Sequence, residues 1–206
     1  LGPKDYDRAT RRLVSFLNEH DVGLVNFHTT VDEWAQALAS VRRRESGPPP
    51  GCEDLPPTEY LDMQDHGFAI GSRPEWAKIV EDDEASDGAA VMMPGDHRQW
   101  ATQQWLRVPP GTKAADAEWT CYAVIRCETT GAEGQAFSFG LYDTINKKGI
   151  GGGSVGVDEI EDADYHVYEM VTSTLAEGMY LWIAPPENPE NVKAVWVDRI
   201  FLRRAE

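Results

Sequence analysis

Apolar and polar side chains alternate in short runs between Trp76 and Leu202, and Gly, Pro, Asp or Asn separates one run from the next. Successive side chains on a β-strand point to opposite faces, so Phe137, Phe139 and Leu141 can line one buried face of a strand. Residues 179–184 repeat this period. Such alternation, interrupted by turn residues, is typical of an antiparallel β-sandwich.

The limits of these runs predict the individual strands. We expect strands near residues 60–70, 76–82, 88–93, 100–108, 118–129, 135–142, 152–158, 165–174, 179–184 and 194–204. Gly88 and Gly178 stand where a tight turn requires a positive φ. The chain is therefore predicted to be mainly β, with a two-sheet jelly-roll sandwich from about residue 60 to residue 206.

The run of residues 149–153 is rich in glycine. It resembles a phosphate-binding loop only superficially, because the Lys-Ser/Thr pair that reaches phosphate and Mg²⁺ is absent and no helix is predicted after it. We expect it to be the mobile tip of a β-hairpin.

Residues 4–44 follow a different pattern. Leu13, Val14, Phe16 and Leu17 have helical spacing, an apolar run follows at 22–27, and a second helix is expected to begin at about residue 30. Residues 1–46 are thus predicted to form a small α/β segment, helix, strand, helix. Such a segment either packs on the sandwich or is the tail of a preceding catalytic domain.

Proline dominates the next stretch, residues 47–59. Its two proline runs cannot continue a helix and favour an extended, semi-rigid connector. We expect the domain boundary here.

The net charge of −16 and a pI near 4.6 exclude some partners. A field of this sign repels polyanions, so no nucleic-acid partner is expected. The run of three arginines at 42–44 is better interpreted as the cationic last turn of a helix. No apolar stretch approaches the ~18 residues that span a bilayer, and no export signal opens the chain, so no membrane partner is expected.

The cysteines, Cys52, Cys121 and Cys127, are too few and too irregularly spaced for a disulfide framework or a zinc site. Cys121 and Cys127 fall on one predicted strand, about 20 Å apart along it, which is too far for a disulfide. We expect buried free thiols.

Several landmarks recur in a familiar order along the predicted sandwich. They are Leu61–Asp65, Ala85–Gly88, Val108–Pro110, Tyr122–Arg126, Leu175–Tyr180 and Val197–Ile200. Their order resembles that of calcium-dependent carbohydrate-binding modules of families six and thirty-five. The resemblance covers about residues 60–206. It implies a galactose-binding-domain-like jelly roll of the kind found at the C-terminus of bacterial glycoside hydrolases.

The resemblance also implies a structural Ca²⁺ ion. The positions that match its ligands are Asp62 and Gln64 on the first strand and Asp198 on the last. All three offer the oxygen donors that Ca²⁺ requires, although Gln64 stands where the family has a carboxylate. The alternative is that Asp198 pairs with Arg126 or caps a turn. The acidic run 81–84 is expected to be a solvated loop.

Sugar recognition needs aromatic faces beside planar polar side chains. Phe137, Phe139, Trp119 and Phe201 are assigned to the core, whereas other aromatic side chains stand next to polar loops. The predicted ligand-binding residues are His97, Arg98, Trp100, Tyr142, Asn146 and Trp182. Trp182 is either a core residue or a platform, with the core favoured.

No catalytic residue is predicted. The chain has 35 acidic residues, so a pair of carboxylates at glycosidase spacing would arise by chance and carries no information. We expect a non-catalytic module that binds a polysaccharide or oligosaccharide, neutral in view of the charge, and targets an attached polysaccharide-degrading enzyme to its substrate. That role implies an extracellular or periplasmic location. The alternative is a structural accessory domain of a glycoside hydrolase that binds no glycan.

Overall fold

The computed structural model describes residues 46–205 apart from 57, 72, 74 and 107–116. These residues belong to one compact unit, Glu45–Glu206. The predicted helix–strand–helix segment therefore lies, but for its last residue, outside the described residues.

The described residues form eleven strands and two short 3₁₀ helices. In chain order these are β1 (Tyr60–Gln64), η1 (Asp65–Gly67), β2 (Ala69–Ile70), β3 (Lys78–Glu81), β4 (Ala89–Pro94), β5 (Thr102–Trp105), β6 (Glu118–Thr129), β7 (Gln135–Asp143), β8 (Lys148–Gly156), η3 (Val157–Glu159), β9 (His166–Thr174), β10 (Met179–Ala184) and β11 (Val192–Arg204).

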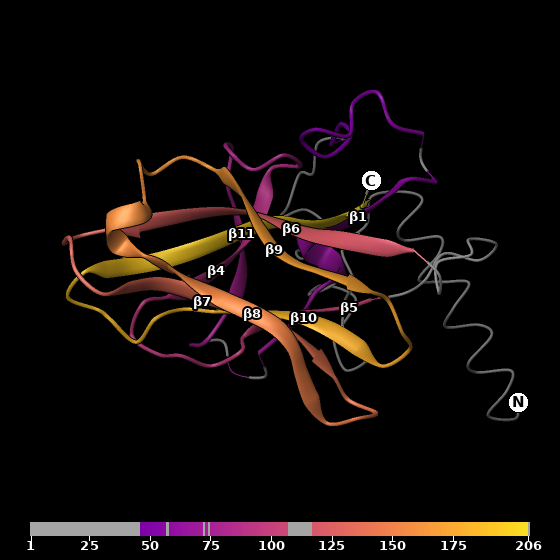
Figure 1. Cartoon of the computed structure of the whole chain (residues 1–206). Coiled ribbons are helices and arrows are strands. Elements are labelled where there is room, and N and C mark those ends of the chain that lie inside the picture. Colours follow the sequence, from indigo (N-terminus) through magenta and orange to yellow (C-terminus); the bar gives the residue numbers. More distant parts are fainter. Residues whose placement is uncertain (1–45, 57, 72, 74, 107–116, 206) are drawn as a thin grey trace, which may run out of the picture. The chain divides into compact units, whose positions relative to one another are not determined.

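The strands make two antiparallel sheets that face each other (Figure 1). The larger sheet has the order β3-β4-β11-β6-β9, with β1 also paired to β11, and the smaller sheet has the order β2-β5-β10-β7-β8. The predicted mainly β, two-sheet sandwich is confirmed. Because β11 pairs with β1, β4 and β6, the last strand connects the start of the domain to its centre.

Alternation along the strands builds the core between the sheets. Phe137, Phe139 and Leu141 of β7 point inward, and Trp119 of β6 is almost fully buried among them. Phe201 is also buried, but on the outer face of the larger sheet, where it forms a second cluster. All four aromatic residues assigned to the core from the sequence are therefore buried.

The segment before β1 covers part of that outer face. The backbone carbonyl of Gly47 accepts hydrogen bonds from both Nη1 and Nη2 of Arg199, each 3.2 Å long. Cys52 is fully buried against Val124 and Phe201. This part of the Pro-rich stretch thus contributes to the packing of the sandwich.

Two predictions about local structure are wrong. Residues 60–70 are not one strand, because η1 separates β1 in the larger sheet from β2 in the smaller one. The glycine run 149–153 is not a hairpin tip but the middle of β8. Its glycines allow close packing of this edge strand: a Cβ on Gly152 would lie 2.5 Å from the carbonyl oxygen of Phe139.

The true turn between β7 and β8 is held by Asp143. Its Oδ1 accepts the backbone N–H groups of Ile145 and Asn146, both at 2.9 Å, in an Asx-type turn. Lys147 completes the turn with a φ of 52°. Gly88 and Gly178 adopt the positive φ values predicted for them, 93° and 81°.

All three cysteines are free and buried. Burial raises the pKa of Cys121 and of Cys127 to about 12, so both thiols stay protonated and unreactive. The prediction of buried free thiols is confirmed. In the part of the chain that the structure describes, no helix has the length and the apolar character needed to cross a membrane.

Candidate functional site

The outer face of the smaller sheet carries a row of aromatic rings. Leu181 of β10 points into the core, so its neighbours Tyr180 and Trp182 point outward. Tyr180 lies opposite Trp105 of β5 on one side and Tyr142 of β7 on the other. The ring centroids are 5.1 Å apart for Trp105 and Tyr180 and 5.6 Å apart for Tyr142 and Tyr180. These three rings form a row across the strands.

A second row runs beside the first. Trp182 lies opposite Gln103 of β5 and Gly140 of β7. Trp100, which precedes β5, stacks on Trp182 with centroids 4.7 Å apart and an interplanar angle of 11°. Trp100 is also 6.2 Å from Tyr142, and 44% of its surface is exposed. The rings of Trp100, Trp182 and Tyr142, predicted separately from the sequence, therefore meet in one site.

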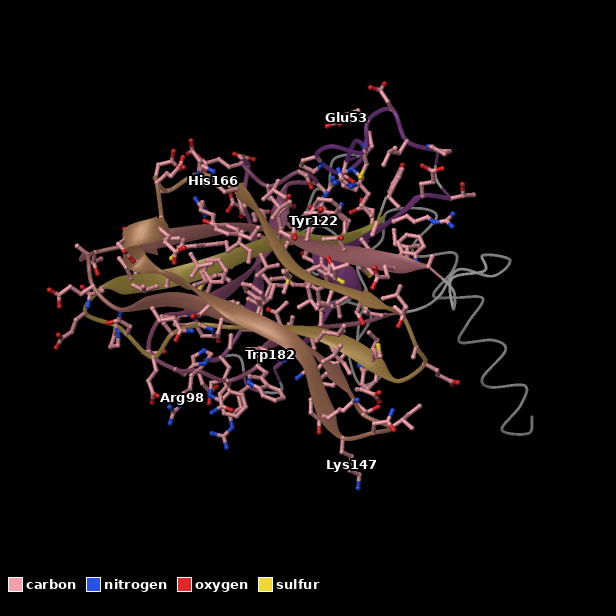
Figure 2. All side chains as sticks on the ribbon, in the orientation of Figure 1. Glu53, Arg98, Tyr122, Lys147, His166 and Trp182 are labelled. Atoms are coloured by element: carbon pink, nitrogen blue, oxygen red, sulfur yellow. The ribbon has the colours of Figure 1, made fainter. Side chains whose placement is uncertain are left out.

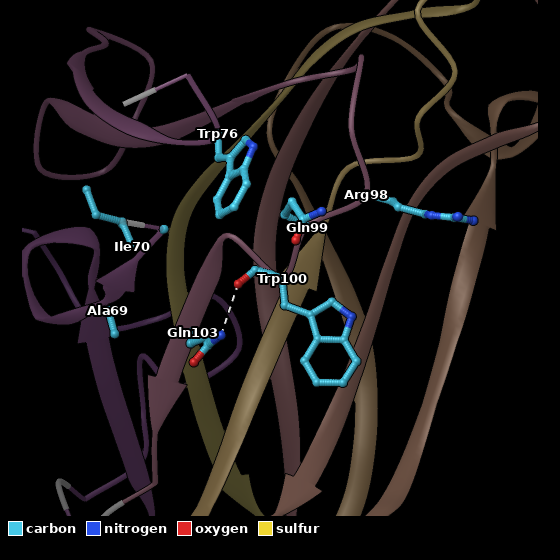
Figure 3. Close-up of a pocket in the computed structure, with 8 residues that line it drawn as sticks. Ala69, Ile70, Trp76, Arg98, Gln99, Trp100 and Gln103 are labelled. Carbon is cyan, nitrogen blue, oxygen red and sulfur yellow. Dashed lines mark hydrogen bonds between the residues drawn. The ribbon is translucent and has the colours of Figure 1, made fainter. Parts of the chain in front are cut away.

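A cavity of about 450 Å³ opens beside Trp100 (Figure 3). Trp76 lines one side, the side chain of Gln99 lies between the indoles of Trp76 and Trp100, and the side chain of Gln103 lies beside Trp100. Nε2 of Gln103 donates to the backbone carbonyl of Trp100 at 3.0 Å, which fixes the start of β5. An aromatic wall and two planar amides are the groups that a sugar ring requires.

His97 is not among the residues that line the cavity, and both of its ring nitrogens contact backbone groups. Its Nδ1 accepts the backbone N–H of Gln99 at 3.1 Å, and its Nε2 lies 2.8 Å from the carbonyl oxygen of Trp76. Since a backbone amide only donates and a carbonyl only accepts, Nδ1 has the acceptor role and Nε2 the donor role in these two contacts. His97 thus connects the two loops that carry Trp76 and Gln99.

Arg98 and Asn146 are placed differently from the indoles. Arg98 lines the cavity but extends away from Trp76, and its Nε lies 3.0 Å from Oε2 of Glu187 (Figure 3). Asn146 is exposed in the β7–β8 turn, where its Nδ2 donates to Oδ2 of Asp143 at 2.7 Å. Its role as a ligand-binding residue stays a prediction.

The strand residues of the aromatic face carry no charge. The outward residues of β5, β10 and the middle of β7 are Gln103, Trp105, Tyr180, Trp182, Ala184, Ser138, Gly140 and Tyr142. The charge of Arg98 beside them is paired with Glu187. In a chain of net charge −16, this face is therefore suited to a neutral ligand.

The predicted calcium ligands also come together, at the β1–β11 pair. Nε2 of Gln64 donates to Oδ2 of Asp62 at 3.1 Å. Ser86 donates to Oδ1 of Asp198 through its backbone N–H at 3.1 Å and its hydroxyl at 2.9 Å, and the same hydroxyl lies 3.5 Å from Oε1 of Gln64. Asp198 thus caps the turn at Ser86, which was the alternative interpretation. The other form of that alternative, an ion pair of Asp198 with Arg126, is not seen, because Arg126 binds Asp82 and Glu84.

The electrostatics of this cluster favour an additional positive charge. Burial raises the pKa of Asp198 to about 6, against the lowering effect of Ser86 and Arg199, and burial also raises the pKa of Asp62. Nη2 of Arg199 lies 3.5 Å from Oδ2 of Asp62 and neutralises it only in part. Within the described ranges, no group of three or more His, Cys, Asp or Glu could hold a metal alone. A cation here would need Gln64 or Ser86 as well.

The acidic run 81–84 is not simply solvated. Asp82 is buried, and its Oδ2 lies 2.6 Å from Nη2 of Arg126 and accepts a 2.8 Å hydrogen bond from the hydroxyl of Tyr165. Glu84 binds the other amino group of Arg126 at 3.0 Å. The sequence did not predict this pairing, because Asp82 and Arg126 are distant in the chain.

Four residues of the aromatic site were missed from the sequence: Trp76, Gln103, Trp105 and Tyr180. Strand alternation could have found Tyr180, because it shares a face with Trp182. Likewise, Gln103 and Trp105 alternate with the buried Thr102 and Gln104. Only the long-range packing of the loops brings Trp76 to the site.

No protein-family model matches the sequence, and no curated protein matches it. Among solved structures, the chain is similar to the arabinose-bound α-L-arabinofuranosidase MgGH51, with a TM-score of 0.46 and 8% identity over 71% of this chain. The match spans 27% of the length of that enzyme.

Two carbohydrate-binding modules are similar over nearly their whole length. The CBM22-1 xylan-binding domain of Paenibacillus barcinonensis Xyn10C has 11% identity and a TM-score of 0.46 over 71% of this chain and 94% of its own. The C-terminal CBM6 of the laminarinase LamC from Zobellia galactanivorans has 7% identity and a TM-score of 0.43 over 70% and 98%. Likenesses at these identities concern the arrangement of the strands alone.

Proposed function

We propose that this domain binds a neutral glycan, without catalysis, on the aromatic face of its smaller sheet. The exposed indole of Trp100, beside a cavity lined by Trp76, Gln99 and Gln103, is the observation that carries the proposal. The C–H face of a pyranose packs on an indole, and the amide groups can bond to neighbouring hydroxyls. Because one exposed indole and two amide groups bury little of a sugar chain, affinity for each site is expected to be weak.

The proposal extends to the biological role. A module of this kind would hold an attached polysaccharide-degrading enzyme near its substrate, outside the cell or in the periplasm. Its advantage would come from raising the local concentration of substrate around the enzyme rather than from tight binding.

We further propose that Asp62, Gln64 and Asp198 hold a structural Ca²⁺ ion. Their oxygens come from the first and last strands of the domain, and burial raises the pKa of both Asp62 and Asp198, so a cation bound beside them would stabilise their ionised forms. The ion would also fix β1 to β11. It would have no part in contacting the glycan.

Binding is tested with a panel of soluble polysaccharides: xylan, mixed-linkage β-glucan, galactomannan and, as an anionic control, polygalacturonate. Affinity electrophoresis and calorimetry should detect a neutral glycan and not polygalacturonate. Trp100→Ala should then weaken binding by at least about tenfold, equivalent to ~1.4 kcal/mol, with little change in melting temperature. Val167→Ala, an equally exposed residue of the larger sheet, serves as the control.

Absence of binding to every polysaccharide would contradict the proposal. The aromatic face would then be a contact surface for another protein domain, as in the structural accessory role. Binding that survives Trp100→Ala unchanged would place the glycan elsewhere.

A further inference from the structure

Gly140 leaves the space on β7 that the indole of Trp182 occupies. It lies in β7 directly opposite Trp182 of β10. A Cβ on Gly140 would lie 2.7 Å from Cε2 and Cζ2 of the Trp182 indole and 2.8 Å from its Nε1. These distances are far below van der Waals contact, so the indole can lie flat on β7 only because this residue is glycine.

Trp182 is in turn covered by Trp100. The two indoles are nearly parallel, 4.7 Å apart, and Trp182 is half-buried whereas Trp100 is 44% exposed. The layers are therefore strand β7, the indole of Trp182 and the indole of Trp100, with solvent beyond. Trp182 is neither a core residue nor a free platform.

Trp100 needs this support because no strand of its own fixes it. It precedes β5, and its backbone carbonyl accepts the one hydrogen bond from Gln103. The contacts that orient its ring are the stack on Trp182 and the tilted contact with Tyr142. The direction of its open face thus depends on where Trp182 lies.

We propose that Gly140 and Trp182 are positioning residues that hold Trp100 as a one-sided platform. The glycan stacks on the outer face of Trp100 and does not enter between the two indoles. A platform open on one side accepts internal units of a polysaccharide, because the chain can continue past the ring in both directions. This inference rests on the proposed glycan binding, but the aromatic stack can be tested separately.

The test compares the whole chain with its Gly140→Ala and Gly149→Ala variants. A Cβ on Gly149 meets no atom within 4 Å, so this change is the matched control on the neighbouring strand. Stacked indoles give an exciton couplet in far-UV circular dichroism, which reports the stack without any ligand. We expect Gly140→Ala to remove the couplet and to weaken binding of the neutral polysaccharide found above by roughly fivefold or more, whereas Gly149→Ala keeps both.

Adding the polysaccharide to the wild-type chain should leave the couplet in place. Loss of the couplet on binding would show that the glycan separates the indoles, and would overturn the inference. So would a Gly140→Ala variant that keeps couplet and affinity. If no polysaccharide binds to the wild-type chain, the proposed function fails, while the couplet still reports whether Gly140 positions the stack.

A second variant covers the case in which Gly140→Ala does not fold. Trp182→Ala removes the support without adding an atom to β7. It should abolish the couplet and weaken binding about as much as Trp100→Ala, although Trp182 does not touch the glycan in this arrangement. Affinity equal to wild type in Trp182→Ala would overturn the positioning role.

Discussion

The two outer faces of the sandwich are built by the same alternation of side chains, but one is covered and charged whereas the other is open and aromatic. On the larger sheet, the guanidinium of Arg126 lies 4.3 Å from the ring centre of Trp196 and binds the buried carboxylate of Asp82. On the smaller sheet, uncharged rings remain open around Trp100. Figure 2 shows Tyr122 and Glu53 on the first side and Trp182 and Arg98 on the second.

This difference separates stability from recognition. On the larger sheet the segment around Gly47 and Cys52 covers the face, and Arg126 pairs with Asp82 and Glu84, although the buried Nε atoms of Arg126 and Arg199 have no hydrogen-bond partner among the described residues. On the smaller sheet the polar groups of Gln99 and Gln103 face a cavity instead. Substitutions on the first face should therefore change the free energy of unfolding and leave glycan affinity intact, whereas truncation of the exposed Trp100 on the second face should weaken glycan binding with little change in the free energy of unfolding.

The largest effect is expected at Arg126. Arg126→Met would leave the buried carboxylate of Asp82 with the hydrogen bonds from the Tyr165 hydroxyl and the Glu84 backbone N–H, but without the guanidinium that balances its charge. Removing one partner of a buried ion pair costs about 3 kcal/mol, or roughly 6–12 °C in melting temperature for a domain of this size. Thermal unfolding measures the loss, and glycan affinity should be unchanged.

Lys193→Met is the control for Arg126→Met. Lys193 forms a 2.7 Å ion pair with Glu128, but both side chains are largely exposed. An exposed pair contributes at most about 1 kcal/mol. Equal losses in the two variants would mean that burial does not distinguish the Arg126 cluster.

The sequence predicts which strand residues point outward, but it does not predict how the side chains outside the strands pack on them. Alternation around Leu181 indicates that Trp182 points out of the core, and it could have placed Tyr180 beside it. The stack of Trp100 on Trp182 could not be predicted, because Trp100 lies outside any strand and meets its partner only through tertiary packing. The glycine run of β8 was wrongly predicted to be a hairpin tip, because turn propensity considers only neighbouring residues. Glycine is required there by packing against Phe139 and Val171, which are distant in the chain.

The next effect concerns calcium. If the ion binds the folded domain alone, a hundredfold excess over its Kd adds about 2.7 kcal/mol, or several degrees in melting temperature. Melting in millimolar Ca²⁺ and in EDTA measures this difference. Asp198→Asn should abolish it, because the amide removes one of the charges that attract the ion. Superimposed curves for the wild-type chain would mean that Asp62, Gln64 and Asp198 bind no metal.

Asp198 should also make stability depend on pH in EDTA. Its pKa is about 6 in the folded domain against an ordinary value of 3.8, so between these values the folded state holds a proton that the unfolded state lacks. Stability should therefore rise as the pH falls from 7 to 5. A hydrogen bond from Asn146 lowers the pKa of Asp143, and one from His166 lowers the pKa of Asp162. The stability that these two carboxylates contribute is lost only below about pH 4, outside the range compared.

The measurement is the change in melting temperature between pH 7 and pH 5, with and without Asp198→Asn. A gain of a few degrees is expected in the wild-type chain and a smaller one in the variant, since Asn keeps the hydrogen bonds from Ser86 but does not titrate. The same gain in both would assign the dependence to other titrating groups, such as the histidines, whose ordinary pKa lies within this range.

The smallest effect is expected at the end of the aromatic row. Trp105 is as exposed as Trp100, 44%, but it packs against Tyr180 at a tilt of 51° and does not line the cavity. A glycan on Trp100 would meet Trp105 only at its far end, so Trp105→Ala should weaken binding about twofold, equivalent to ~0.4 kcal/mol.

Calorimetry with short and long oligosaccharides of the bound type measures this loss of affinity. The loss should appear with the long ligand and vanish with the short one, because only a longer chain reaches across β10 to Trp105. A loss equal to that of Trp100→Ala with the short ligand would move the centre of the site from Trp100 to the row of Trp105, Tyr180 and Tyr142.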